Sequence, residues 1–270
     1  MAALKACLIA LCLLLPVYTV HAAPCDGPVK VRISSDYAPF SYKDQSGRIT
    51  GLDVELLREI FAAIGCEYEL IDLPFKRALK EVAKGSIDMM PFMSITPERQ
   101  TFARFSVPYR NETAGFIMRK EDMSAASIQS LADILKHRLV IGHELGTYRG
   151  TEFEEFLTSE QSKNAVFQVA STSEGLRMLI AGRIDALVVS NPSVRVAAKA
   201  DWNGKIAPHP FILSSKPVHF MFSRKTASDD LVDAINDAIE NIIVTDHYSQ
   251  SFGAMALSPK TRPTTQAAIK

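Results

Sequence analysis

Apolar side chains along the chain follow two alternating patterns. In some segments they recur every three or four residues, as on one face of a helix, and in others they form short continuous runs that suit buried strands. Residues 53–64 show the helical pattern, and Gly65 follows as a helix stop. The predicted helices cover residues 53–64, 75–84, 128–136, 146–157, 173–181 and 229–244, and the predicted strands cover 29–34, 67–71, 87–91, 138–142, 165–169 and 184–189.

The alternation of strands and helices predicts an α/β fold with mainly parallel sheets. One local echo adds to this picture. Residues 85–88 read GSID and residues 182–185 read GRID, and each segment follows a predicted helix and opens a predicted strand. Two similar α/β lobes would produce such a repetition.

The first residues have a pattern of their own. Lys5 is followed by an apolar run over residues 8–15, and small or tolerated residues precede position 23. This order is typical of a secretory signal peptide, and the apolar run is too short to span a bilayer. We expect residues 1–22 to be removed on export, which predicts a periplasmic mature protein.

Two cysteines remain after removal of this leader, Cys25 and Cys66. Each stands just before a predicted strand, at 29–34 and 67–71. If the two strands are parallel neighbours, their starts lie close enough for a disulfide, which an oxidising compartment favours. Two free buried thiols are the alternative.

Charge and motifs narrow the function. The chain of 270 residues carries 30 basic and 30 acidic side chains, so a basic surface for nucleic acid or an anionic membrane is not expected. The sequence contains no Cys/His pair, HExxH motif, glycine-rich phosphate loop or metal-type cluster. We therefore expect no catalytic residue, no metal, no cofactor and no nucleic-acid partner.

Several short motifs are similar, in order and spacing, to those of the family 3 extracellular solute-binding proteins, the polar amino-acid receptors of ABC importers. They are YAPFSY at 37–42, TGLDVEL at 50–56, GSID at 85–88, SITPER at 94–99, FSVPY at 105–109, GT at 146–147 and AGRIDA at 181–186. The resemblance implies the periplasmic-binding-protein type II fold, in which two α/β lobes joined by two crossing segments close on a ligand by hinge motion. Lobe 1 would comprise residues 29–113 and 213–257, lobe 2 residues 114–212, and a loose tail residues 258–270.

Arg99 is the first candidate for ligand binding. Thr96 and Pro97 predict a helix start that places Arg99 in the first turn, where free N–H groups favour an anion. A guanidinium group can also hold a carboxylate through two hydrogen bonds. The resemblance implies that Arg99 binds the ligand α-carboxylate and that Ser94 and Thr96 contact the ligand nearby. Without it, a helical arginine is most often a surface residue.

Other candidates come from the same comparison of pattern and position. Tyr37, at the end of the first strand, and Phe75 are expected to wall the ligand side chain, although core packing is the alternative for Phe75. Arg77 is a candidate for a second acidic group, against a surface position. Gly146-Thr147-Tyr148 is predicted to open a helix whose N–H groups reach the ligand carboxylate, with an ordinary capped helix as the alternative.

The amine side of the expected site departs from the family. Typical amino-acid binders of this family carry an acid after the strand that matches residues 185–189, and here that position is Ser190. Two alternatives follow. Either the ligand is a carboxylate without an α-amine, or Glu144 binds the amine.

The function that these features predict is a periplasmic solute-binding protein, monomeric, that captures an amino acid or related small carboxylate for the membrane component of an ABC importer. Two other functions stay open on the same fold. One is a secreted dehydratase acting on cyclic carboxylic acids, and the other is a sensory module that presents ligand to a membrane kinase.

Overall fold

The computed structural model describes residues 23–123, 127–197 and 204–258. The predicted signal peptide and all but the first residue of the predicted tail lie outside this range. The strands are β1 (Val29–Ile33), β2 (Asp36–Tyr37), β3 (Ser41–Lys43), β4 (Ile49–Thr50), β5 (Tyr68–Asp72), β6 (Met89–Met93), β7 (Ala103–Arg119), β8 (Ile141–Glu144), β9 (Val166–Val169), β10 (Ala186–Ser190) and β11 (Ile206–Ser223). The helices are α1 (Leu52–Ile64), α2 (Phe75–Lys84), α3 (Pro97–Gln100), α4 (Leu131–Lys136), α5 (Thr151–Thr158), α6 (Thr172–Ile180), α7 (Pro192–Ala197), α8 (Asp229–Ile242) and α9 (Asp246–Phe252).

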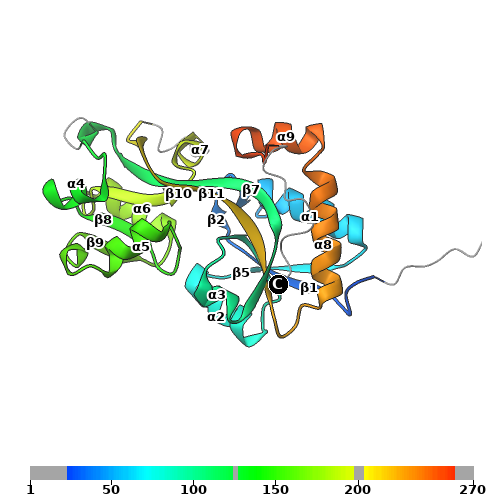
Figure 1. Cartoon of the computed structure of the whole chain (residues 1–270). Coiled ribbons are helices and arrows are strands. Elements are labelled where there is room, and N and C mark those ends of the chain that lie inside the picture. Colours follow the sequence, from blue (N-terminus) through cyan, green and yellow to red (C-terminus); the bar gives the residue numbers. More distant parts are fainter. Residues whose placement is uncertain (1–22, 124–126, 198–203, 259–270) are drawn as a thin grey trace, which may run out of the picture.

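Eight of these strands form one extended sheet in the order β5-β1-β6-β11-β7-β10-β8-β9. The three strands at each end run parallel to one another. The long strands β7 and β11 are antiparallel to each other and to the strand on either side of them. Figure 1 shows that β7 and β11 run from one α/β lobe into the other, which confirms the predicted two-lobed fold with two crossings.

Each lobe has helices on both faces of its part of the sheet. In lobe 1, α1 and α8 bury side chains such as Ile60 and Ile235 against one face, and α2 covers the other with Phe75 and Val82. In lobe 2, α4 and α5 pack on one face and α6 on the other. The expected lobe boundaries at 113/114 and 212/213 fall within β7 and β11, where Ala114 pairs with Ser214, and they stay a prediction.

The predicted disulfide is confirmed. Cys25 and Cys66 are bonded, with their Cα atoms 6.1 Å apart. The reason is the one expected from the sequence, because β1 and β5 are parallel neighbours and Val29 pairs with Tyr68 at their starts. The bond therefore joins the chain entry into β1 to the end of α1.

The predicted helix at 146–157 begins later than expected, at Thr151. Gly146 and Gly150 both have positive φ angles, 85° and 110°, which take the backbone out of the helical region at both ends of this segment. Residues 147–150 therefore form a loop without helical structure. Within the described residues, no helix is long and apolar enough to cross a membrane.

Candidate functional site

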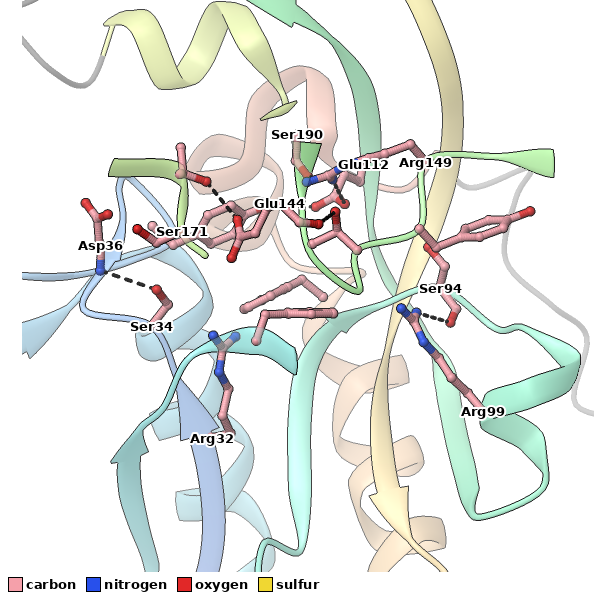
Figure 2. Close-up of a pocket in the computed structure, with 16 residues that line it drawn as sticks. Arg32, Ser34, Asp36, Ser94, Arg99, Glu112, Glu144, Arg149, Ser171 and Ser190 are labelled. Atoms are coloured by element: carbon pink, nitrogen blue, oxygen red, sulfur yellow. Dashed lines mark hydrogen bonds and ion pairs between the residues drawn. The ribbon is translucent and has the colours of Figure 1, made fainter. Parts of the chain in front are cut away.

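A pocket of about 560 Å³, including the part open to solvent, lies between the two lobes beside the crossing strands (Figure 2). Lobe 1 and the crossing strand β7 contribute Arg32, Ser34, Asp36, Tyr37, Phe75, Phe92, Ser94, Arg99 and Glu112. Lobe 2 contributes Glu144, Thr147, Tyr148, Arg149, Ser171, Thr172 and Ser190.

Most of these side chains stand at or just after the carboxyl ends of parallel strands. Ser34 follows β1, Ser94 follows β6, Glu144 ends β8 and Ser190 ends β10. Loops at these strand ends are the usual place for ligands in open α/β sheets. The topology brings both sets of strand ends to the same cleft, so the pocket is a consequence of the fold.

Arg99 lies in this pocket as expected, and its side chain is only 6% exposed. Its guanidinium group donates to the Ser94 carbonyl (2.9 Å) and, across the cleft, to the Gly146 carbonyl (3.1 Å). Burial lowers the pKa of Arg99 to about 10, so the group stays charged at neutral pH. No carboxylate oxygen of the described chain lies within 4.0 Å of it. Because α3 has only four residues, the side chain rather than the helix dipole supplies the positive charge.

The structure places two candidates away from the pocket wall. Thr96 caps α3 by accepting a hydrogen bond from the Arg99 backbone N–H (3.3 Å), which turns its hydroxyl toward the helix. Arg77 is exposed on α2, because Phe75, Ala78 and Val82 form the buried face of that helix and position 77 points the other way. The proposal that Arg77 selects a second acidic group therefore loses its structural basis.

The lobe 2 wall is held by its own hydrogen bonds. The Thr147 hydroxyl donates to the Glu144 carbonyl (2.7 Å) and lies 3.0 Å from His143 Nε2. The Glu144 carboxylate accepts from the Thr172 hydroxyl (2.9 Å). Burial and the charge of Arg149 lower the pKa of His143 to about 3, so this histidine is neutral. Thr147 and Tyr148 reach the pocket from the loop after β8 and not from a helix start.

Arg149 and Glu112 are pocket residues that the sequence did not single out. Arg149 is 7% exposed, donates to the Ser190 hydroxyl, and has Nη1 4.0 Å from a Glu112 carboxylate oxygen. Glu112 also accepts from the Tyr37 hydroxyl (2.9 Å) and from Arg110 (3.1 Å). The space next to Ser190 is therefore occupied by a cation from the chain itself. The sequence signals that could have identified them are the charge of Glu112 within the long crossing strand and the position of Arg149 next to Gly150.

Arg32 was also missed. It stands with Lys30 in a predicted strand, where charged residues among apolar neighbours usually face solvent. In the structure it is 2% exposed and lies over the rings of Phe75 and Phe92, at 5.5 and 5.4 Å from the ring centres. Burial lowers its pKa to about 10. Tyr37, Phe75, Ser94, Arg99, Glu144, Thr147, Tyr148 and Ser190 are the predicted residues that the structure brings together in the pocket.

Comparison with known proteins gives a consistent result. The family model described as "Bacterial extracellular solute-binding proteins, family 3" matches residues 29–252. The L-arginine-binding protein of Pseudomonas aeruginosa is 28% identical over 182 residues, covering 66% of this chain and 67% of that protein. A P235GK mutant of ArgBP from T. maritima has a TM-score of 0.71 at 23% identity, covering 85% of this chain and 95% of that one.

A second solved structure bears on the enzyme alternative. It is an ancestral amino acid-binding protein, AncCDT-1, described as a precursor of cyclohexadienyl dehydratase. It has a TM-score of 0.67 at 23% identity and covers 86% of this chain and 96% of its own. The two solved structures bear out the periplasmic-binding-protein type II fold, and all three similar proteins are named as binding proteins or precursors rather than as enzymes.

Proposed function

Because the chain belongs to family 3 of the bacterial extracellular solute-binding proteins, we propose that it binds an amino acid or related small carboxylate and delivers it to an ABC importer. Removal of residues 1–22 on export would place it in the periplasm. The similar proteins support the ligand class, since one is named for L-arginine and another is described as an amino acid-binding protein.

The burial of Arg99 without an ion-pair partner is the observation on which this proposal rests. Arg99 is a buried cation on a pocket wall, and among the described side chains no carboxylate is near enough to form an ion pair with it. A buried guanidinium is stabilised when an anion with complementary geometry reaches it. A ligand carboxylate supplies that anion, and Ser94 lies beside it on the pocket wall.

Contacts across the cleft support a closing motion around the ligand. Arg99 in lobe 1 donates to Gly146 in lobe 2, and Arg195 in lobe 2 donates to the Ala38 carbonyl in lobe 1 (3.4 Å). Arg195 also lies over the Tyr37 ring, 4.6 Å from its centre. These bonds hold the lobes together over the pocket, so ligand entry requires them to part at β7 and β11.

The proposal leaves two alternatives for a ligand α-amine: Glu144 binds it, or the ligand has none. Ser190 is engaged by Arg149, which makes it a poor partner for an ammonium group. Glu144 lines the pocket and its carboxylate is bound by a hydroxyl rather than a cation. If the ligand carries an α-amine, Glu144 is the residue that binds it; otherwise the ligand lacks the amine.

A thermal-shift screen of the twenty amino acids and of small carboxylic acids tests the function, because a ligand that binds only the folded state raises its melting temperature. Calorimetry then compares each hit with its deaminated analogue, on the wild type and on Glu144→Gln. A hit that loses affinity in Glu144→Gln while its deaminated analogue does not assigns the amine to Glu144. Equal binding of the deaminated acid assigns a ligand without an amine.

The same preparation separates binding from catalysis. We expect no turnover of prephenate, a cyclic carboxylic acid of the class that the dehydratase alternative requires. No ligand in the screen, or turnover of prephenate at an enzymatic rate, would contradict the proposed function.

A further inference from the structure

Arg32 is a buried cation that the binding scheme above does not use. Its Nε donates to the Leu73 carbonyl (2.9 Å), and its Nη1 is buried with no hydrogen-bond partner in the structure. A buried ionised group with an unsatisfied donor and no counter-charge at ion-pair distance is costly for a folded protein. The missing partner is therefore expected to be an anion that reaches Arg32 from the pocket.

The side chain is aimed at that pocket. Arg32 is one of its lining residues, and Figure 2 shows the guanidinium group rising from β1 toward the side of the pocket where Glu144 lies. The rings of Phe75 and Phe92 are both within 6 Å of it, at 5.5 and 5.4 Å from their centres. These contacts and the bond to Leu73 hold the guanidinium group in place without neutralising it.

The charged residues that line the pocket differ in whether the chain itself supplies them with a partner. Arg149 is engaged by Ser190 and approaches Glu112. Neither Arg32 nor Arg99 has an ion-pair partner among the described residues. Against these two cations, Glu144 contributes one carboxylate that is bound only by a hydroxyl. Asp36 interacts electrostatically with the buried Arg195, and Glu144 and Asp72 interact in the same way, at longer than ion-pair distance, with Arg32. The pocket lining carries three arginines and three carboxylates, and the two arginines without an ion pair both lie on the lobe 1 side.

Arg32 and Arg99 lie near enough for one small molecule to reach both. Their guanidinium carbons are 5.5 and 5.8 Å from the centre of the same Phe75 ring. They are therefore no further apart than the sum of these distances, about 11 Å. Each guanidinium–carboxylate contact takes up about 4 Å of that span. Two contacts leave about 3 Å along the direct line, so a ligand that reaches both guanidinium groups is a short one.

We propose that Arg32 is a second anion-binding point and that the ligand is a small dicarboxylate, with one carboxylate at Arg99 and the other at Arg32. This inference rests on the proposed function and names the ligand class of the same pocket. An acidic amino acid satisfies it with its amine at Glu144, and a plain diacid satisfies it without one. Neutral and basic amino acids leave Arg32 Nη1 buried without a hydrogen-bond partner.

Calorimetry with matched probes tests the second anion-binding point. Succinate, glutarate, aspartate and glutamate are each compared with their monoamides, which keep the shape and remove one charge. On the wild type we expect at least one diacid to bind about 10- to 100-fold more tightly than its monoamide, as expected for hydrogen bonds to a charged group. Arg32→Met should reduce this ratio to within about threefold and leave the affinity for the monoamide nearly unchanged.

Three controls separate this role from a structural one. Arg32→Lys keeps the charge and should retain part of the preference for the diacid. Arg77→Met, an exposed arginine on the neighbouring helix, should retain all of it. The melting temperature of ligand-free Arg32→Met should not fall by more than a few degrees; if that variant does not fold, Arg32→Gln, which keeps a donor near Leu73, carries the same comparison.

The outcomes distinguish the two proposals. A wild-type protein that prefers monoamides or basic amino acids, or an Arg32→Met variant with an unchanged ratio, overturns the dicarboxylate inference and leaves the solute-binding function standing. Absence of binding to every diacid, monoamide and amino acid overturns both.

Discussion

The two walls of the pocket satisfy their charges in different ways. On the lobe 1 wall, Arg32 and Arg99 are buried against aromatic rings and bonded only to backbone carbonyls. On the lobe 2 wall, Arg149 donates to Ser190, and the Glu144 carboxylate accepts a hydroxyl of the same lobe. In the proposed function the lobe 1 wall receives the anion, whereas the charged groups of the lobe 2 wall are engaged mainly by other side chains of the chain.

The largest expected effect is the loss of ligand binding on the lobe 1 wall. Arg99→Ala should weaken the affinity for the ligand found in the screen by roughly 30- to 4000-fold, because it leaves a buried carboxylate without its charged partner. Calorimetry measures the change, and circular dichroism checks that the fold is kept. Arg149→Met is the matched change on the lobe 2 wall and should cost less, since Arg149 already has partners in the chain. If Arg149→Met costs as much affinity as Arg99→Ala, the two walls do not differ in their contribution to anion binding.

The second effect concerns the stability of lobe 1, which alone contains the disulfide of the described chain. Replacing Cys25 and Cys66 by serine opens a loop with a sequence separation of 41, which should cost roughly 4 kcal/mol in the chain-entropy model, and often less in practice. Denaturant unfolding with and without reducing agent measures it. A reduced wild type as stable as the oxidised one would contradict the prediction. Binding at a temperature where both forms are folded should change little, because the bond lies away from the pocket.

The third effect is a loss of folding stability at acid pH that originates from His143 in lobe 2. His143 is 3% exposed and its pKa is lowered to about 3, whereas an unfolded histidine titrates near pH 6.5. Between these values the unfolded state binds a proton that the folded state does not, so stability is lost as the pH falls below about 6.5. The expected loss from this group is about 2 kcal/mol between pH 7 and pH 5.

Urea unfolding of the wild type and of His143→Gln at the two pH values isolates this contribution. The variant should show a smaller difference between pH 7 and pH 5. His219→Gln gives the same comparison in lobe 1: burial also lowers the pKa of His219, so this variant should narrow the difference as well. A difference that is the same in His143→Gln as in the wild type would remove His143 as a cause.

The smallest effect separates the two roles considered for Thr96. As the cap of α3, its replacement by alanine should cost about 1 kcal/mol of stability. Affinity should fall by less than about tenfold, because the backbone N–H of Arg99 and not the ligand loses its hydrogen bond. Thermal unfolding and calorimetry on Thr96→Ala measure the two quantities. A loss of affinity comparable to that of Arg99→Ala would instead indicate direct contact with the ligand.

Local pattern predicted much of the fold. The helices α1, α2 and α8 lie where apolar side chains recur at helical spacing, and Gly65 and Gly85 end two of them in the left-handed conformation. These features depend on residues near one another in the chain. The helix predicted to begin at Gly146 begins instead at Thr151. Two glycines with positive φ enclose a loop before it, and the spacing of apolar residues does not reveal that loop.

The sequence by itself determined the alternation of strands and helices, the pairing of Cys25 with Cys66, and Arg99 as the first candidate of the site. Only the tertiary structure decided that Arg32 and Arg149 belong to the same pocket. They stand on β1 and on the loop after β8, in different lobes, and meet because the crossing strands bring both sets of strand ends to one cleft. The direction of a charged side chain on a strand depends on what packs against each face, and that packing involves residues far apart in the chain.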